Sequence, residues 1–179
     1  LHRFQRHTRL CDQGAIGRSH CANGNVQGVV GVGGLVGYNV NLAWVATCYT
    51  TCLVHGEEGM AGGLVGYGAE DSFISRSFAT GPVTGKFGIG GLTGAVEDGA
   101  QISYSYARGV VSGQQWVGGL AGRVKEGTIN QCYATGVVTG NQNFGGLVGV
   151  AESVQVTDSY WNMETSGLAV SATGEGRTT

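Results

Sequence analysis

The side chains with the most reactive chemistry in this sequence belong to five cysteines and four histidines. The number of cysteines is odd and no Cys-x-x-Cys pair is present, so there is no standard redox or zinc signature. A metal site would have to be built from Cys11, His20, Cys21, Cys48, Cys52 and His55, of which only Cys48 and Cys52 have a spacing near that of zinc ligands. Because Cys52 takes the place of a turn glycine in a repeated segment, we predict neither a metal site nor a cofactor.

Acidic residues beside a histidine are the second candidate source of chemistry. Residues 55–59 read His-Gly-Glu-Glu-Gly, which lacks the second histidine of the metalloprotease motif and has two glycines that oppose a helix. Further acidic pairs at 70–71 and 97–98 fall in turn-like segments, where exposed charge is the usual state. The Gly-Gly pairs are not followed by Gly-Lys-Ser/Thr, so they do not resemble phosphate loops. We therefore predict no catalytic residue and no enzymatic activity.

Residues suited to binding precede the Gly-Gly pairs of three successive segments. These turns read Lys-Phe at 86–87, Gln-Gln-Trp at 114–116 and Asn-Gln-Asn at 141–143. If they stack, aromatic rings lie among amides in a ridge suited to contact with a glycan or a protein. The predicted binding residues are Phe87, Gln114, Gln115, Trp116 and Asn143. In the alternative interpretation, Phe87 and Trp116 pack against their neighbours at a corner of the fold.

These turns belong to an internal repeat, which is the strongest signal in the sequence. The pattern Gly-Gly-Leu-x-Gly occurs five times, and successive copies start 29, 28, 28 and 27 residues apart. A second block, Ser/Cys-aromatic-Ala-x-Gly, keeps the same spacing at 77–81, 105–109 and 132–136. A unit of this length cannot bury its apolar side alone, so neighbouring units must stack as in a solenoid.

Short strands explain each repeat better than helices do. Each block has several glycines, which cost roughly 1 kcal/mol each in a helix, whereas segments such as 102–106 are rich in β-branched, aromatic and small residues. We predict an all-β solenoid of five to six coils, stacked ~4.8 Å apart, with either a triangular section or a flattened two-sheet one. The glycines are expected to allow corners with positive φ. Four inward columns are expected: Leu35, Leu64, Leu92, Leu120 and Leu147; Val26, Val54, Val83, Val111 and Val138; Tyr49, Phe78, Tyr106, Tyr133 and Tyr160; and Ile74, Ile102, Ile129 and Val156.

Stacking also decides what the cysteines can do. Cys48 and Cys132 share a column with serines and lie three coils apart, about 14 Å at the spacing of paired strands, which is too far for a disulfide. Cys21 and Cys48 can lie on adjacent coils, and this arrangement would permit a disulfide between them. We favour buried free thiols.

Composition excludes several other classes of protein. The 179 residues include 35 glycines but one proline, and the glycines do not recur every third residue, so the chain is not collagen. Apolar residues make up 41% of the chain, too many for a flexible linker or a disordered tail. Beyond residue 18 there are six basic and eleven acidic residues, which offers no face for nucleic acid. No apolar run is long enough to span a membrane.

The repeated blocks resemble the GLUG repeats of bacterial surface and secreted proteins. The Gly-Leu-x-Gly core at 34–37 and 146–149, the Cys-Tyr-Ala-Thr-Gly block and the closing segment 159–167 carry the resemblance, which covers about residues 21–179. It implies an extracellular or cell-surface location, within an adhesin-like protein or beside a protease domain. Members of this family are not known as catalysts.

From these observations we expect a structural or adhesive module of an extracellular bacterial protein that binds a glycan or a host protein. The alternatives are a filament subunit that self-associates end to end, an accessory domain of a secreted protease and an ice-binding protein. Ice binding is disfavoured because Arg108 interrupts the column of Thr51, Thr80 and Thr135. We assign 1–20 to a non-repeat segment or cap, with a divergent coil or foreign sequence as alternatives, 21–158 to the solenoid and 159–179 to a closing segment.

Overall fold

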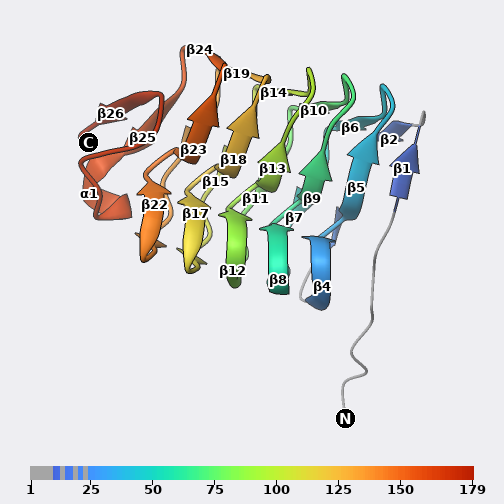
Figure 1. Cartoon of the computed structure of the whole chain (residues 1–179), viewed down its shortest axis with the longest axis horizontal. Helices are drawn as coiled ribbons and strands as arrows, with labels where there is room; N and C mark the ends of the chain where they lie inside the picture. Colours follow the sequence, from blue (N-terminus) through green and yellow to red (C-terminus); the bar gives the residue numbers. More distant parts are fainter. Residues whose placement is uncertain (1–9, 13–14, 18–19, 22–23) are drawn as a thin grey trace.

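The computed structural model of the chain describes residues 10–12, 15–17, 20–21 and 24–179. Parallel strands follow one another along a single axis, and each turn of the chain adds one level to each of four sheets (Figure 1). The predicted β-solenoid is therefore confirmed, with about five coils.

Each sheet collects the strands that occupy the same position in successive coils. The first sheet has β1 (Leu10–Asp12), β5 (Val36–Val40), β9 (Val65–Gly68), β13 (Thr93–Val96), β18 (Ala121–Lys125) and β23 (Val148–Glu152). The second has β2 (Ala15–Gly17), β6 (Trp44–Ala46), β10 (Phe73–Ser75), β14 (Gln101–Ser103), β19 (Thr128–Asn130) and β24 (Gln155–Thr157). The third has β3 (His20–Cys21), β7 (Tyr49–Thr50), β11 (Phe78–Ala79), β15 (Tyr106–Ala107), β20 (Tyr133–Ala134), β25 (Tyr160–Asn162) and β26 (Glu175–Arg177).

The fourth sheet contains the longest strands and changes along the solenoid. Its first three members are β4 (Asn25–Gly33), β8 (Leu53–Gly62) and β12 (Val83–Gly90). In the next two coils the same path is divided into two short strands, namely β16 (Val111–Ser112) with β17 (Gln115–Gly118), and β21 (Val138–Thr139) with β22 (Gln142–Gly145). The only helix among the described residues is α1 (Met163–Ser166).

Equivalent residues of successive coils pair directly, as the repeat predicts. Ile74 pairs with Ile102, which in turn pairs with Ile129. Between the Gly-Gly-Leu-x-Gly segments, the N–H of Leu64 donates to the carbonyl of Leu92 over 2.9 Å. Each residue therefore lies over its counterpart, which turns a repeated position into a column along the axis.

The interior is divided into two apolar clusters. The larger one contains the predicted leucine and isoleucine columns, and the leucines from Leu64 to Leu147 are fully buried. The smaller one lies inside the bend of the fourth sheet and contains the predicted valine column, with Val54, Val83 and Val111 fully buried. A coil therefore has two lobes, each with its own core, rather than a triangle or a single flat sandwich.

The aromatic column is the one inward column that was predicted wrongly. Tyr49 is 37% exposed, and the four rings that follow it are half-buried at the surface of the third sheet. The inward positions belong instead to the next residue of each strand: Thr50, Ala79, Ala107, Ala134 and Trp161. Because side chains alternate between the two faces of a strand, only one of the two residues can be inside, and before the last coil, where Trp161 stands, the inward residue is small.

Glycine is required where the two lobes meet. A Cβ on Gly62 would lie 2.0 Å from the carbonyl oxygen of Val65 and 2.5 Å from the Cα of Thr93 in the next coil. The same collision recurs at Gly90, where the first contact is the carbonyl oxygen of Thr93 at 2.0 Å. The first glycine of the motif thus allows backbone segments to touch between the lobes.

Most corners with positive φ are formed by other residues, contrary to expectation. One corner column consists of Thr47, Arg76, Tyr104, Gln131 and Asp158, all with φ between 47° and 56°. Left-handed backbone is disfavoured for residues with a Cβ. The sheets on both sides of each corner fix the geometry, and the corner residue adopts it at some energetic cost.

The two ends of the solenoid differ. At the start, β1, β2 and β3 pair with β5, β6 and β7, so the described parts of 10–21 form a divergent coil, one of the alternatives above. At the far end, the chain passes through α1 and returns as β26 beside β25 (Figure 1). The ring of Trp161 lies against Gly146, its indole N–H donates to the carbonyl of Leu168, and Ser171 accepts from the N–H groups of Leu147 and Val148. Residues 161–177 therefore cap this end.

Candidate functional site

The three turns of the predicted ridge stack on one another. In the fourth sheet Phe87 pairs with Gln115, and Gln115 pairs with Gln142. The N–H of Gln114 donates to the carbonyl of Lys86 over 3.0 Å, which joins the first turn to the second. Gln115 is half-buried in this column, whereas Gln114 is exposed at the tip of its turn.

Trp116 and Asn143 occupy the next column, in which every backbone is left-handed. The φ angles of Gly31, Met60, Gly88, Trp116 and Asn143 lie between 49° and 65°. Glycine and asparagine adopt this conformation readily, but a tryptophan there is an outlier. Met60 and Asn143 share this conformation, so the column as a whole imposes it on Trp116, as the sheets do at the other corners.

Phe87 and Trp116 form an aromatic pair across neighbouring coils. Their ring centroids are 6.3 Å apart at an angle of 60°, and the guanidinium of Arg123 lies 5.5 Å from the centre of the indole ring. Such tilted ring pairs and cation–π contacts are both favourable. Both rings are half-buried, so each packs at the corner and also presents surface to solvent. The two interpretations of these rings are therefore compatible.

A polar network holds Arg123 over the indole. Its guanidinium contacts Glu97 at 2.8 Å and Glu152 at 3.5 Å, and the hydroxyl of Tyr67 donates to Glu97 over 3.2 Å. Burial, assisted by the charge of Glu97, raises the pKa of Tyr67 to about 12. The side chain of Glu97 is only 16% exposed, so this acid departs from the exposure that is usual for charge in a turn. The network bridges the coils on both sides of the small residue Ala95.

A shallow hollow of about 450 Å³ lies beside the ridge. It is lined by His55, Gly56, Glu57, Glu58, Gly85, Lys86 and Gln114. Its charged groups are already engaged, since Lys86 contacts Glu58 at 2.9 Å and Gln27 donates to Glu57 at 3.1 Å. The imidazole of His55 is 2.8 Å from the hydroxyl of Thr84. The hollow therefore presents hydrogen-bond donors and acceptors next to the aromatic pair.

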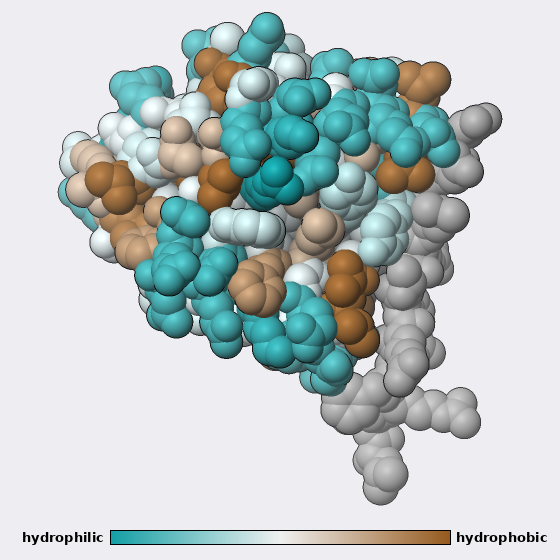
Figure 2. Space-filling model, in the orientation of Figure 1, coloured by the Kyte–Doolittle hydropathy of each residue, from teal (hydrophilic) through white to brown (hydrophobic). Residues whose placement is uncertain are grey.

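The face of the molecule that contains this ridge is chemically mixed. Figure 2 shows apolar side chains over β4, β8 and β12, with polar side chains around them. On β4, Val29 and Val30 are 54% and 43% exposed. Apolar area bordered by hydrogen-bonding groups is typical of a recognition surface rather than of an inert one.

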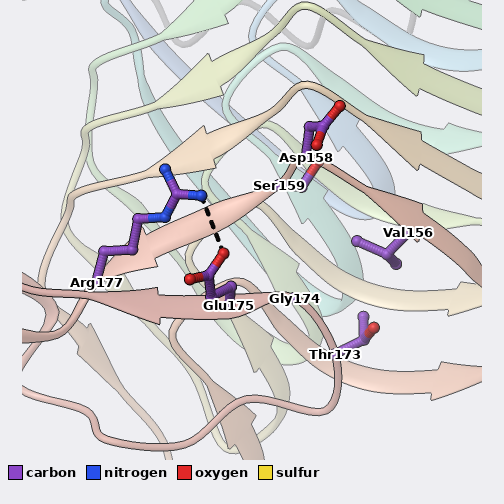
Figure 3. Close-up of a pocket in the computed structure, with 7 residues that line it drawn as sticks. All are labelled: Val156, Asp158, Ser159, Thr173, Gly174, Glu175 and Arg177. Carbon is purple, nitrogen blue, oxygen red and sulfur yellow. Dashed lines mark hydrogen bonds and ion pairs between the residues drawn. The ribbon is translucent and has the colours of Figure 1, made fainter.

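A second hollow, of about 370 Å³, lies where the cap meets the last coil (Figure 3). Arg177 and Glu175 form an ion pair of 2.9 Å at its edge, and Asp158 and Ser159 approach it from the opposite side. The guanidinium of Arg177 also lies 4.5 Å from the ring centre of Tyr160. These charges satisfy one another, and the hollow contains no aromatic face, so it is the weaker candidate.

Two aromatic features lie on the surface, of which the first was not predicted and the second is the aromatic column that was predicted to point inward. Trp44, 52% exposed, forms a tilted pair with Phe73 on the second sheet, with 5.2 Å between centroids. The outward rings of the third sheet stack from Tyr49 to Tyr160. The sequence signals both, because Trp44 and Phe73 are one repeat apart and the second block contains an aromatic residue in every copy.

The cysteines whose side chains are described are buried in the packed interior of the solenoid. Cys48 and Cys132 are buried within a serine column, as predicted, and Cys132 is a free thiol. The alternative bridge between Cys21 and Cys48 involves a side chain outside the described residues. The N–H of Cys132 donates to the hydroxyl of Ser159 at 3.0 Å, and burial raises the pKa of the Cys132 thiol to about 12. Cys52 is buried and disulfide-bonded, which its interpretation as a replaced turn glycine missed. The side chains of Cys11, His20 and Cys21, part of the metal set, lie outside the described residues.

Within the described ranges, no three His, Cys, Asp or Glu side chains are grouped so that they could hold a metal ion. The same residues include no helix that is long and apolar enough to cross a membrane.

Comparisons with protein-family models, with curated proteins and with solved structures find no significant match to this chain. The resemblance to GLUG repeats stays a prediction that depends on the motifs alone. Any functional conclusion must therefore come from the chemistry of the surface.

Proposed function

We propose that this chain is a non-catalytic β-solenoid module of an extracellular bacterial protein, and that its ridge binds a carbohydrate. The observation that carries the proposal is the half-buried indole of Trp116, which contacts the ring of Phe87 and the guanidinium of Arg123 at the surface of the ridge. Rigid aromatic surface combined with hydrogen-bonding groups is the usual composition of a small-molecule site. The adjacent hollow supplies such a group through the amide of Gln114, which is exposed at the tip of its turn.

An extracellular location for the module has one chemical support. Cys52 forms a disulfide, and disulfides persist in oxidising compartments outside the cytosol. The accessory-domain alternative shares this location and differs only in the domain to which the module is attached.

The binding test uses a panel of immobilised bacterial and host glycans with the wild-type chain and matched variants. Trp116→Asn removes the ring but keeps a residue type that Asn143 already places in this column at a φ of 51°. We expect this variant to bind at least about tenfold more weakly, which corresponds to about 1.4 kcal/mol, with an unchanged melting transition. Phe87→Ala should weaken binding in the same way.

The control for this test replaces Trp44, which is more exposed than Trp116. Trp44→Gln introduces the residue type of Gln101, which lies two coils along the same column. Its binding should equal that of the wild type. If Trp44→Gln abolishes glycan binding while Trp116→Asn keeps it, the ridge is not the site. Binding of host proteins but of no glycan would also contradict the proposal.

Self-association is the second candidate, and β4 favours it. This nine-residue strand has no charged side chain and is the last strand of its sheet among the described residues, and exposed edges of this type promote pairing with other chains. The cap at 161–177 opposes it, because the other end of the solenoid is covered. Sedimentation at several concentrations decides between them: growth in size with concentration supports assembly, and a constant monomer contradicts it.

A further inference from the structure

The outward rings of the third sheet form a continuous stack along the solenoid axis. The centroid distances are 5.1 Å from Tyr49 to Phe78, 4.8 Å from Phe78 to Tyr106, 4.8 Å from Tyr106 to Tyr133 and 5.6 Å from Tyr133 to Tyr160. The planes of neighbouring rings differ by 10° or less. Three phenols, those of Tyr106, Tyr133 and Tyr160, are consecutive in this stack and are half-buried, so solvent reaches them.

We propose that this run of three tyrosines is a site of oxidative cross-linking, at which a one-electron oxidant joins neighbouring phenols of the same chain into dityrosine. Each of two phenols gives one electron to one equivalent of oxidant and one proton to water, which leaves two phenoxyl radicals. The radicals combine through the ring carbons next to the oxygens. The hydrogen on each joined carbon then moves through solvent to the oxygen of its ring, which restores both phenols. The net change is the loss of two hydrogen atoms from the protein and the reduction of two equivalents of oxidant.

Coupling of two radicals requires them to form close together, and the column imposes this. The backbone pairing of Tyr106 with Tyr133 and of Tyr133 with Tyr160 keeps each phenol beside the next. Arg108 adds a second constraint, because its guanidinium lies 4.9 Å from the ring centre of Tyr106 and 5.9 Å from that of Tyr133, and it donates to the Tyr133 hydroxyl at 3.1 Å. The guanidinium therefore helps to hold the two rings stacked on each other.

The rest of the chain offers poorer pairs. Phe78 separates Tyr49 from Tyr106, so coupling cannot extend towards the start of the solenoid. Tyr38 and Tyr67 are adjacent at a similar distance, but their planes differ by 58° rather than being stacked, and a hydrogen bond to Glu97 fixes the Tyr67 hydroxyl. The site is therefore confined to the last three rings of the stack.

A bond between these rings would act as a covalent staple between coils. Linking Tyr106 to Tyr133 closes a loop of about one repeat, and linking Tyr133 to Tyr160 fixes the last coil to the strand from which the cap begins. Cross-links that close loops of this size restrict the unfolded chain and stabilise the folded one.

The test exposes the folded chain to photo-generated ruthenium(III) trisbipyridine, a one-electron oxidant. The expected product is a monomer with dityrosine fluorescence and a mass lower by two hydrogen atoms, and tandem mass spectrometry should locate the bond at Tyr133. The yield per chain should not depend on protein concentration. Coupling that occurs only between chains, and therefore rises with concentration, would overturn the proposal.

Three variants sharpen the test. Tyr133→Phe leaves no two adjacent phenols in the stack and should lower the yield of monomeric dityrosine at least fivefold. It is expected to fold, because Phe78 already occupies this column. Phe78→Tyr creates a run of five phenols and should raise the yield. Tyr67→Phe removes the competing pair and should leave the yield unchanged. Equal yields from Tyr133→Phe and the wild type would refute the assignment.

Discussion

Replacing Gly62 by alanine is expected to destabilise the solenoid severely, although it adds a single methyl group. The new Cβ would lie 2.0 Å from the Val65 oxygen, 2.5 Å from the Thr93 Cα and 2.7 Å from the Gly94 nitrogen, all of them backbone atoms. Ordinary van der Waals contacts of a Cβ begin at 3.4 Å, so these segments would have to separate by more than 1 Å. No flexible side chain can move away to relieve the contact.

The loss of stability can be estimated from the hydrogen bonds that this separation would weaken. Overpacking in a core costs about 1–3 kcal/mol where side chains can rearrange. Here the backbone itself must move, which weakens hydrogen bonds between coils, such as that from the Gly34 N–H to the Gly62 carbonyl, at about 1 kcal/mol each. We expect a loss of at least about 3 kcal/mol, a large share of the roughly 5–15 kcal/mol that holds a domain folded.

Gly59→Ala is the matched control, since both glycines are in β8. Its Cβ would lie 3.4 Å from the carbonyl oxygen and 3.8 Å from the Cβ of Phe87, which is ordinary contact, and its φ is not positive. Alanine should therefore be neutral or stabilise by about 0.4–1 kcal/mol through the unfolded chain. Urea unfolding followed by circular dichroism and tryptophan fluorescence measures both variants. If the free energy of unfolding of Gly62→Ala is within about 1 kcal/mol of the wild type, the backbone of the two lobes is not in close contact at Gly62.

Two further outcomes can be checked with single variants. The free energy of unfolding of Cys132→Ser should be within about 1 kcal/mol of the wild type, because the column already contains hydroxyls that accept a hydrogen bond from the preceding coil. Cys132→Val should be less stable, because valine cannot accept the hydrogen bond of the Ser105 N–H. Equal stabilities of the two variants would contradict this explanation. In absorbance titration, Tyr67 should ionise near pH 12, and Tyr67→Phe should remove that step. Since the folded pKa is the higher one, Tyr67 contributes stability that is present below pH 10 and is lost between pH 10 and about 12; a late step that survives in Tyr67→Phe belongs to another residue.

The arrangement of columns was predictable because the repeat fixes which residues stack. Once the Gly-Gly-Leu-x-Gly copies are aligned, the pairing of Ile74 with Ile102, or of Phe87 with Gln115, follows from counting. The aromatic column was misplaced because large apolar residues were taken to be inside, while the alternation of faces gives the interior to Ala107 rather than to Tyr106.

Other features have no local signal in the sequence. Nothing in the residue type of Arg76 or Trp116 indicates a left-handed backbone, because the conformation is imposed by the sheets on either side of the corner. Likewise, the contact of Arg123 with Glu97 and Trp116 joins side chains from two neighbouring coils. It depends on how far side chains reach around a corner, and periodicity does not contain that information.

The one-dimensional order of the coils determines how this molecule would respond to being pulled from its ends. Each coil contacts only its neighbours, so tension along the axis would unfold the coils one at a time rather than the whole solenoid at once. A released repeat of about 28 residues spans about 95 Å when extended, against the ~4.8 Å it occupies in the stack. Under load, each coil of a module so built would therefore lengthen roughly twentyfold.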